Sequence, residues 1–439
     1  MEKLTKHDGL HSLQLRENLW YVGAQDHDIK IFDIIMVTDF GTSYNSYIYK
    51  TSEGYVLFET VKVLFYDEYI KKIKEVVGND LSQIKYILVN HTEPDHSGSV
   101  ENLAKLIPNI KIIGSKNTIK YLKEVTNIDD LNTVEAVEGK DLKIGNSTFQ
   151  FLNVPMLHWP DSIYTYIKEE KILVTCDSFG SHYAFDDILM SKLPQNKWDD
   201  YFKAFQYYYT AIFSPFKKHV LFAIDKIKRL DYNLICCGHG PVLDEKIDFV
   251  VNKYKEWSTE EKITKKIVVI PYCTAYGYTA MMAAEIEKGI KSVDKSIRIY
   301  PYPIDVANYA AKKPEILANI ATASAVVIGS CTINNDALPL AHDILSSLSA
   351  CNQKCKIGAA FGSYGWSGEG VPNLTARLAQ IGFATMKGLA INFKPSQAQL
   401  KQCHKYGEKI GNAIINDLLE SDDVFKPISH KACLMQELD

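Results

Sequence analysis

The segment from His91 to His96 constrains this chain more than any other, because four of its six residues can bind a metal ion. The segment reads HTEPDH and closely follows the apolar run YILV, which is typical of a buried strand. A loop at the end of a strand can direct several side chains to one point while the sheet holds the loop still. Pro94 stiffens this loop, and Gly98 permits a tight turn after it. We therefore expect a metal site at the end of the strand.

Three later segments repeat this pattern, with a candidate ligand soon after an apolar run. One histidine of this kind is usually a hydrogen-bonded structural residue, so only the whole set indicates a metal. His182 is a further, less favoured candidate. The set has four imidazoles and three carboxylates: His91, Glu93, Asp95, His96, His158, Asp177 and His239. Seven ligands are too many for one tetrahedral ion, so they predict two ions with one carboxylate able to bridge them.

A second set of candidate binding residues lies in three loops of the C-terminal part. The first loop fits the pattern T-x-x-G-x-T, in which hydroxyls and free N–H groups at a helix N-terminus can bind a phosphate. The third loop offers Tyr364 and Trp366 to flank a flat ring. In a doubly wound sheet, ligands bind at the carboxyl ends of the strands, where all three loops would lie. The candidates are Thr274, Ala275, Tyr276, Gly277, Tyr278, Thr279, Ser330, Cys331, Thr332, Ile333, Asn334, Asn335, Ser363, Tyr364, Gly365, Trp366, Ser367 and Gly368.

The periodicity of the chain divides it into two parts. In the first part, apolar runs such as DIIMV, NSYIYK and YVLFET predict strands, and residues 61–77 and 198–213 have helical patterns. After a charged stretch, short apolar strands alternate with helices, which is typical of βαβ units and a parallel sheet. We therefore expect an α/β protein with domains at residues 1–255 and 266–420 and a C-terminal tail at residues 421–439.

Composition and charge exclude several classes of function. The net charge of −4 provides no basic surface for nucleic acid or anionic lipid. We find no secretory signal and no apolar run long enough for a membrane span, so we expect a cytoplasmic protein. The nine cysteines include no CxxC pair, which argues against a disulfide framework, a zinc ribbon or a rubredoxin-type iron site.

The ligand order HxExDH…H…D…H resembles the metal signature of the metallo-β-lactamase fold, an αββα sandwich. Hydrolases of that fold usually carry histidine where this chain has Glu93. A carboxylate-rich, thiolate-free set favours hard, redox-active ions over zinc. The HxE variant resembles the flavodiiron proteins, and the three later loops resemble the FMN-binding loops of flavodoxins, although Pro is common where Cys331 stands. The resemblance covers nearly the whole chain, including MLHWPDSIYTY and GSYGWSGE.

This resemblance implies two iron ions and FMN in a chain with a flavodoxin-like second domain. One iron would be held by His91, Glu93 and His158, and the other by Asp95, His96 and His239, with Asp177 as the bridge. Thr279 and residues 330–335 would hold the phosphate and ring edge of FMN, and the Trp366 loop would cover the ring.

The activity implied is reduction of O₂ to water, of NO to N₂O, or of both. FMN stores two electrons and two irons store one each, which matches the four electrons that O₂ requires. An external donor would supply them, either a rubredoxin-like protein or a reduced deazaflavin. A head-to-tail homodimer, or a homotetramer made of two such dimers, would bring the flavin of one chain to the metals of the other.

Two other functions remain open. One is a dizinc hydrolase with a regulatory flavodoxin domain, against which Glu93 argues. The other is an electron-transfer or redox-sensing module with a degenerate metal site. His27 is one possible pocket residue near the irons, although we favour a surface position for it.

Overall fold

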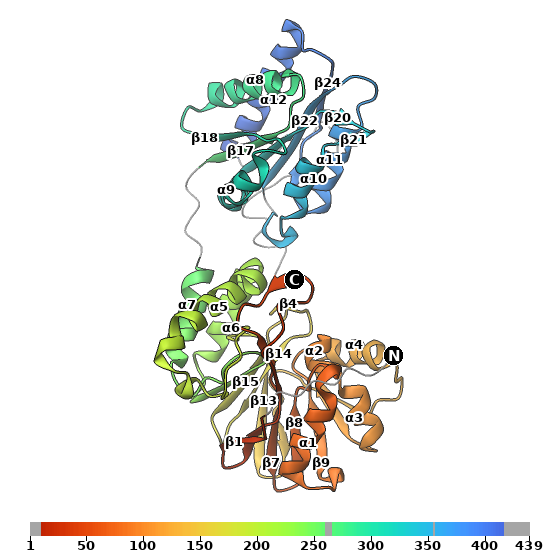
Figure 1. Ribbon diagram of the computed structural model, residues 1–439, viewed down its shortest axis with the longest axis vertical. Coiled ribbons are helices and arrows are strands. Elements are labelled where there is room, and N and C mark those ends of the chain that lie inside the picture. Colours follow the sequence, from red (N-terminus) through yellow and green to blue (C-terminus); the bar gives the residue numbers. More distant parts are fainter. Residues whose placement is uncertain (1–9, 260–265, 354–355, 417–439) are drawn as a thin grey trace. The chain divides into compact units, whose positions relative to one another are not determined.

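The computed structural model describes residues 10–259, 266–353 and 356–416 of the chain. The chain divides into two compact units, residues 1–260 and 261–439 (Figure 1). Each unit has its own apolar core. The tail predicted for residues 421–439 lies outside the described residues. Among the described residues, no helix combines the length and the apolar character needed to cross a membrane.

The first unit contains two mixed sheets that face each other. Side chains from both sheets, among them Phe58, Ile113, Phe149 and Val174, form a core between them. The first sheet has the spatial order β1 (Leu13–Arg16), β2 (Leu19–Tyr21), β7 (Tyr47–Thr51), β8 (Gly54–Phe58), β9 (Ile84–Leu88), β10 (Lys111–Gly114) and β11 (Thr133–Glu135). The second sheet has the order β12 (Leu142–Ile144), β13 (Ser147–Asn153), β14 (Ile163–Ile167), β15 (Ile172–Cys176) and β16 (Leu234–Cys237).

Helices cover the outer faces of these sheets (Figure 1). On one side lie α1 (Tyr66–Val77), α3 (Val100–Leu106) and α4 (Lys116–Thr126), and on the other lie α5 (Trp198–Tyr208), α6 (Lys217–Ile227) and α7 (Ile247–Ser258). In α1 the buried residues Tyr69, Ile73 and Val77 recur every four positions, so one face of the helix packs against the core. The helical pattern at residues 198–213 forms α5 followed by a π-helix (Tyr209–Phe213). The first unit is therefore the αββα sandwich that the sequence predicts.

The strand predicted for the run DIIMV, which begins at Asp33, is wrong in its first half. Asp33 and Ile34 have φ angles of 45° and 59° and form a turn between β4 (Ile31–Phe32) and β5 (Met36–Val37). Ile34 is 93% exposed and Ile35 is 79% exposed. A β-branched residue in the left-handed region is strained, so local propensity does not explain this turn. Two small strands, β3 (Ala24–Asp26) and β6 (Thr42–Tyr44), flank this hairpin in the sequence and pair with each other.

The second unit is a doubly wound parallel sheet. Its spatial order is β18 (Arg298–Pro303), β17 (Ile267–Tyr272), β19 (Ala325–Gly329) and β22 (Ile357–Tyr364), with β23 (Ala384–Thr385) and β24 (Leu389–Asn392) both paired to β22. This is the flavodoxin-like order 2-1-3-4-5. One face packs against α8 (Tyr278–Val293) and α12 (Gln397–Asn416), and the other against α9 (Tyr309–Thr322), α10 (Pro339–Ser346) and α11 (Gly370–Gln380).

The helices α8 and α12 are in backbone contact where Gly289 meets Gly407. A Cβ atom on Gly289 would collide with the carbonyl oxygen of His404, and one on Gly407 would collide with that of Ile286. Only glycine permits so close an approach at these two positions.

Candidate metal centre and flavin-binding loops

The seven predicted metal-binding residues lie together at one edge of the αββα sandwich. His91 to His96 follow β9, Asp177 directly follows β15, His239 follows β16, and His158 lies between β13 and β14. Asp95 and His96 belong to a short helix, α2 (Pro94–Ser97). The two sheets are joined beside the site, because the N–H of Ile163 donates to the carbonyl of Asn90 at 2.9 Å. Four strand ends therefore bring these side chains to one place.

The ligand atoms form two groups, and within each group they lie within 4.8 Å of one another. The Glu93 group consists of His91, Glu93 and His158, with Asp177 within the same distance, and the Asp95 group consists of Asp95, His96 and His239. The buried thiol of Cys176 lies within the same distance of His96 and Asp177, and burial raises its pKa well above the usual value. Oε2 of Glu93 is 3.1 Å from Nε2 of His91 and 2.8 Å from Nε2 of His158. Oδ2 of Asp95 is 3.2 Å from Nε2 of His239 and 3.5 Å from Nε2 of His96.

Asp177 lies between the two groups and presents one carboxylate oxygen to each. Its Oδ2 atom is 3.2 Å from Nε2 of His158 and 3.5 Å from Nε2 of His91. Its Oδ1 atom is 2.7 Å from Nε2 of His96 and 3.4 Å from Nε2 of His239. This is the disposition that a carboxylate shared by two ions requires.

The residues present fit a pair of metal ions. Two ligand atoms that each lie about 2.1 Å from one octahedral ion, at right angles, are roughly 3 Å apart, which matches the distances above. Both carboxylate oxygens of Asp95 and both ring nitrogens of His96 are buried without a hydrogen-bond partner, an arrangement that calls for a cation. A Cβ atom on Gly238 would lie 2.7 Å from Cε1 of His96 and 3.0 Å from Oδ1 of Asp177, so this glycine leaves room for the ligands.

The charges of the metal-free site are balanced by protons. Burial alone would lower the pKa of His96, but Asp95 and Asp177 outweigh it and raise that pKa to about 9. Burial opposes the rise for His158 as well, yet hydrogen bonds to Asp177 and Glu93 raise its pKa to about 9. Burial would raise the pKa of Glu93, but the two histidines hold it well below its usual range. Metal ions would replace these protons on binding.

Aromatic rings enclose the Asp95 group. The ring of Phe32 lies 4.2 Å from that of His182 and 5.4 Å from that of His239. His182, the less favoured candidate ligand, belongs to neither group: its Nδ1 atom is 2.8 Å from Oγ1 of Thr42, and its ring is 5.0 Å from that of His239. Burial, and then His239, hold the pKa of His182 well below its usual value, so this ring is neutral. The hydroxyl of Tyr208 donates to the carbonyl of Asp177 at 3.1 Å.

Three other residues complete the account of this region. The predicted surface residue His27 is exposed. Glu59 is buried and accepts a hydrogen bond from the N–H of Asn90 at 3.0 Å, and burial raises its pKa to about 7. Asp161 is also buried, and its Oδ1 atom lies 3.7 Å from Nδ1 of His91. Neither carboxylate is among the residues predicted for the site. The motif HWPDS was a usable signal for Asp161, whereas nothing local distinguishes Glu59.

The first of the predicted flavin loops begins α8. Gly277 precedes the helix with a φ angle of 78°, which glycine adopts without strain. The buried hydroxyl of Thr279 lies 2.9 Å from that of Ser363, so this loop contacts the third loop. The backbone N–H of Ala280 points at Oγ1 of Thr274 at 3.4 Å. A helix N-terminus flanked by hydroxyls in this way can bind a phosphate.

The second loop is a small hairpin that is also tied to the third loop. Its strands are β20 (Thr332–Ile333) and β21 (Asp336–Ala337), and Asn334 and Asn335 turn between them. The N–H of Gly370 donates to Oγ1 of Thr332 at 3.3 Å, and the hydroxyl of Ser367 donates to Oδ1 of Asn335 at 3.5 Å. All three predicted loops therefore meet at the carboxyl edge of the sheet.

Large aromatic side chains stand exposed on these loops. Trp366 is 99% exposed and Tyr276 is 84% exposed, so neither is a core residue. Both are free to contact a flat ring. Cys331, in the position where flavodoxins commonly have Pro, is buried.

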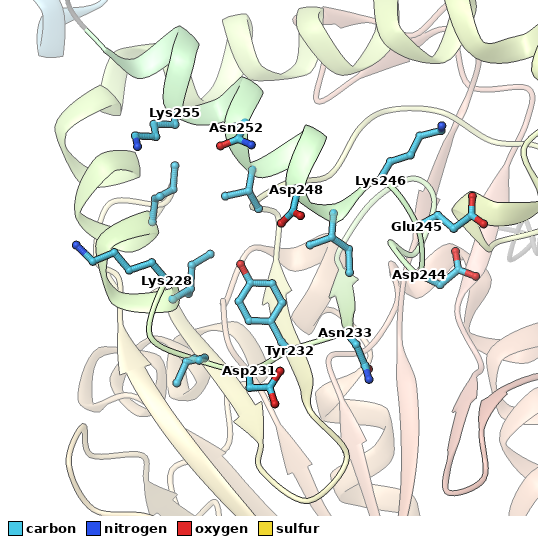
Figure 2. Close-up of a pocket in the computed structure, with 15 residues that line it drawn as sticks. Lys228, Asp231, Tyr232, Asn233, Asp244, Glu245, Lys246, Asp248, Asn252 and Lys255 are labelled. Carbon is cyan, nitrogen blue, oxygen red and sulfur yellow. The ribbon is translucent and has the colours of Figure 1, made fainter.

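A cavity of the first unit lies elsewhere, between α6 and α7 (Figure 2). It has a volume of about 670 Å³, and its rim carries Lys228, Asp231, Lys246, Asp248 and Lys255. None of the predicted metal-binding or flavin-binding residues lines it. Its charges of both signs select no ligand class.

Comparisons with protein families match both units. A family described as "ODP family beta lactamase" matches residues 42–240. The flavodoxin family matches residues 270–407. The first match includes all four segments that supply candidate metal ligands, and the second includes all three candidate flavin loops.

Known relatives match the chain over nearly its full length. It is 39% identical to the flavo-diiron protein FprA2 of Clostridium acetobutylicum, over 92% of this chain and 100% of the relative. It is 31% identical to an anaerobic nitric oxide reductase flavorubredoxin of Vibrio vulnificus, over 91% of this chain and 79% of the relative. A solved structure, rubredoxin oxygen:oxidoreductase of Desulfovibrio gigas, matches with a TM-score of 0.62 at 27% identity, over 92% of this chain and 99% of that one.

Proposed function

Because the chain belongs to the flavodiiron protein family, we propose that it is an oxidoreductase that reduces O₂ to water, NO to N₂O, or both. Its cofactors are FMN and a pair of iron ions. When bound, the iron pair supplies Lewis-acid and one-electron chemistry, and FMN stores two electrons.

The single observation that carries this proposal is the placement of Asp177, with one oxygen toward each ligand group. We assign the Glu93 group to one iron, the Asp95 group to the other, and Asp177 to both. Three carboxylates and no thiolate in this set favour iron over zinc. Glu93 in particular gives the first iron an anionic oxygen ligand, which offsets the charge of an oxidised ion.

The residues around the ligands hold the site in shape and limit the access of water. Phe32, His182 and Tyr208 form an aromatic wall beside His239. The neutral His182 adds no charge that would oppose a cation. Tyr208 fixes the backbone of Asp177 through its hydroxyl, so the bridging carboxylate keeps its position between the two groups.

We further propose that the three loops of the second unit bind FMN. Residues 274–279 offer N–H groups and hydroxyls to the phosphate, and residues 330–335 face the edge of the ring. Trp366, which is 99% exposed, covers the ring from the loop at residues 363–368. The hydrogen bonds that connect the three loops support a common ligand.

We propose a head-to-tail homodimer, which can pair further into a homotetramer. The turn of the β4–β5 hairpin exposes Ile34 and Ile35, and Phe32 of the same hairpin packs against the site histidines. The flavin loops and their neighbours expose Tyr276, Val306, Trp366 and Phe393. Exposed apolar patches mark interaction sites. Contact between the hairpin of one copy and the flavin loops of another would cover both patches and bring a flavin to the metals.

The electrons come from an external donor, for which we propose a rubredoxin-like protein or a reduced deazaflavin. The names of two relatives, a flavorubredoxin and a rubredoxin oxygen:oxidoreductase, favour the first of these.

Anaerobic stopped-flow spectroscopy tests this function. The fully reduced protein is mixed separately with O₂ and with NO, and flavin reoxidation is followed. We expect reoxidation within the mixing experiment by at least one of the two gases. The proposal would be contradicted, and the hydrolase favoured, by two results together. The protein would contain zinc without iron, and its flavin would be reoxidised by either gas no faster than free reduced FMN.

A further inference from the structure

The carboxylate of Asp161 accepts hydrogen bonds through one of its oxygens, and its other oxygen has no partner. Its Oδ2 atom accepts hydrogen bonds from the hydroxyl of Thr92 at 2.7 Å and from that of Thr118 at 3.2 Å. Its Oδ1 atom is buried and has no hydrogen-bond partner. Asp161 is 1% exposed, so water does not replace a partner from the bulk. Oδ1 is therefore an acceptor that is fixed in position and free of other bonds.

The ring of His91 presents the matching donor. Its Nε2 atom faces Glu93 at 3.1 Å and Asp177 at 3.5 Å, while its Nδ1 atom, which also lacks a hydrogen-bond partner, faces Oδ1 of Asp161 at 3.7 Å. A ring with Nε2 on a metal must carry its proton on Nδ1. A small movement of the ring then closes the gap to hydrogen-bond length.

The other histidines near the centre have different environments. Nδ1 of His239 lies 2.5 Å from the carbonyl oxygen of Ser43, so this ring is held by a neutral group. Nδ1 of His96 has no hydrogen-bond partner in the described part of the chain. Among the described residues, His91 is the one of these three rings with a buried carboxylate oxygen within 4.0 Å of its Nδ1 atom; the buried Glu59 acts on His96 from farther away.

We propose that Asp161 is a positioning residue that accepts a hydrogen bond from Nδ1 of His91 and so directs Nε2 of that ring at the iron of the Glu93 group. The inference rests on the proposed function. Carboxylate partners of this kind orient metal-binding histidines, and their loss typically weakens metal binding by about 10- to 100-fold.

A cavity that Asp161 lines provides an independent way to test this role. It has a volume of about 320 Å³ and is lined by Asp161 together with Ser115, Asn117 and Pro160. Because Asp161 lines this cavity and faces Nδ1 of His91, we expect removal of its side chain to connect the two. Formate is small enough to enter and would restore a carboxylate at that place.

The experiment measures iron release from the full-length protein under a ferrous-iron chelator. We expect Asp161→Ala to release one of its two irons about 10- to 100-fold faster than wild type, and Asp161→Asn to lie between them. Added formate should slow release from Asp161→Ala, whereas chloride at equal ionic strength should not. Asn117→Ala, which changes the same cavity without facing His91, is the matched control and should behave like wild type.

The two proposals fail in different ways. Wild-type release rates in both Asp161 variants would overturn the positioning role and leave the proposed function intact. The positioning role would also be overturned if formate did not slow the faster iron release and Asn117→Ala released iron equally fast. That result would indicate a general loosening of the structure around the site. A wild-type protein without iron would overturn the proposed function itself. FMN content and circular dichroism show whether Asp161→Ala is misfolded. If it is, the iron-release rate of Asp161→Asn tests the positioning role in its place.

Discussion

Gly238 lies so close to His96 that a methyl group on the glycine would be 2.7 Å from Cε1 of the imidazole. The same methyl group would be 3.0 Å from Oδ1 of Asp177. Real Cβ atoms do not approach other atoms so closely, so a ligand would have to move. The backbone at Gly238 thus forms part of the wall of the metal centre.

Gly238→Ala should therefore displace a ligand without unfolding the chain. We expect the iron of the Asp95 group to be lost or weakened, with a decrease of about 1–3 kcal/mol in the free energy of unfolding from overpacking. Metal analysis and urea denaturation measure the two effects, and FMN content is the internal control. Two tightly held irons in this variant would contradict the arrangement.

His96→Asn should empty one iron position and abolish O₂ uptake while FMN stays bound. The ring supplies the nitrogen nearest to Oδ1 of Asp177, at 2.7 Å, and asparagine cannot replace it as a ligand in the same geometry. Iron and flavin are quantified on the same sample, and O₂ uptake is measured with an electrode. Full activity in this variant would show that the ligand set is wrong.

Thr279→Val and Trp366→Ala should weaken FMN retention and leave iron content near normal. Valine at position 279 removes the hydroxyl that lies 2.9 Å from Ser363, and an unpaired buried hydroxyl costs about 1–3 kcal/mol. Trp366→Ala removes the proposed ring cover. Ultrafiltration followed by absorbance measures the retained flavin, with Thr322→Val as an exposed control on α9. Loss of iron and flavin together would indicate misfolding.

Ile34→Asn should weaken the proposed homodimer. Asparagine tolerates the φ angle of 59° better than isoleucine does, so the isolated chain should be no less stable. The apolar contact is lost, and we expect the dimer dissociation constant to rise at least tenfold, or about 1.4 kcal/mol. Sedimentation velocity measures this. Leu106→Asn, at another exposed apolar position, serves as the control and should leave the dimer unchanged.

The metal-free protein should lose stability as pH rises through about 9. The folded-state pKa values of His96 and His158 are raised from 6.5 to about 9, because protonated rings pair with the carboxylates around them. Their contribution is complete below pH 6.5 and disappears above pH 9, so the melting temperature of metal-free protein should fall across this range. Iron competes with the same protons, so its affinity should rise across the range. Calorimetry of metal binding at pH 7 in two buffers should detect proton release. Metal binding without proton release would contradict these pKa shifts.

The convergence of the candidate ligands could be anticipated from the sequence because each follows a strand, and strand ends meet at sheet edges. The strand–helix alternation of the doubly wound sheet could be anticipated from apolar periodicity, which reports burial over short distances, whereas the αββα sandwich was implied only by the resemblance of the ligand pattern to the metallo-β-lactamase fold. DIIMV was misassigned because its first half is an exposed, strained turn, and periodicity assumes that apolar residues are buried. Asp161 and Glu59 were missed because their roles depend on contacts across the fold, with His91 and Asn90. The motif HWPDS marks the position of Asp161 but not its partner, and no local pattern marks Glu59.

The contact between Gly289 and Gly407 has a mechanical consequence for cofactor binding. The last described helix, α12, packs against α8, and the first turn of α8 adjoins the proposed phosphate site. A larger side chain at either glycine would push α8 and α12 apart and shift the N–H groups at the start of α8. We therefore expect the affinity for flavin to depend partly on Gly289 and Gly407, although neither residue belongs to the proposed flavin loops.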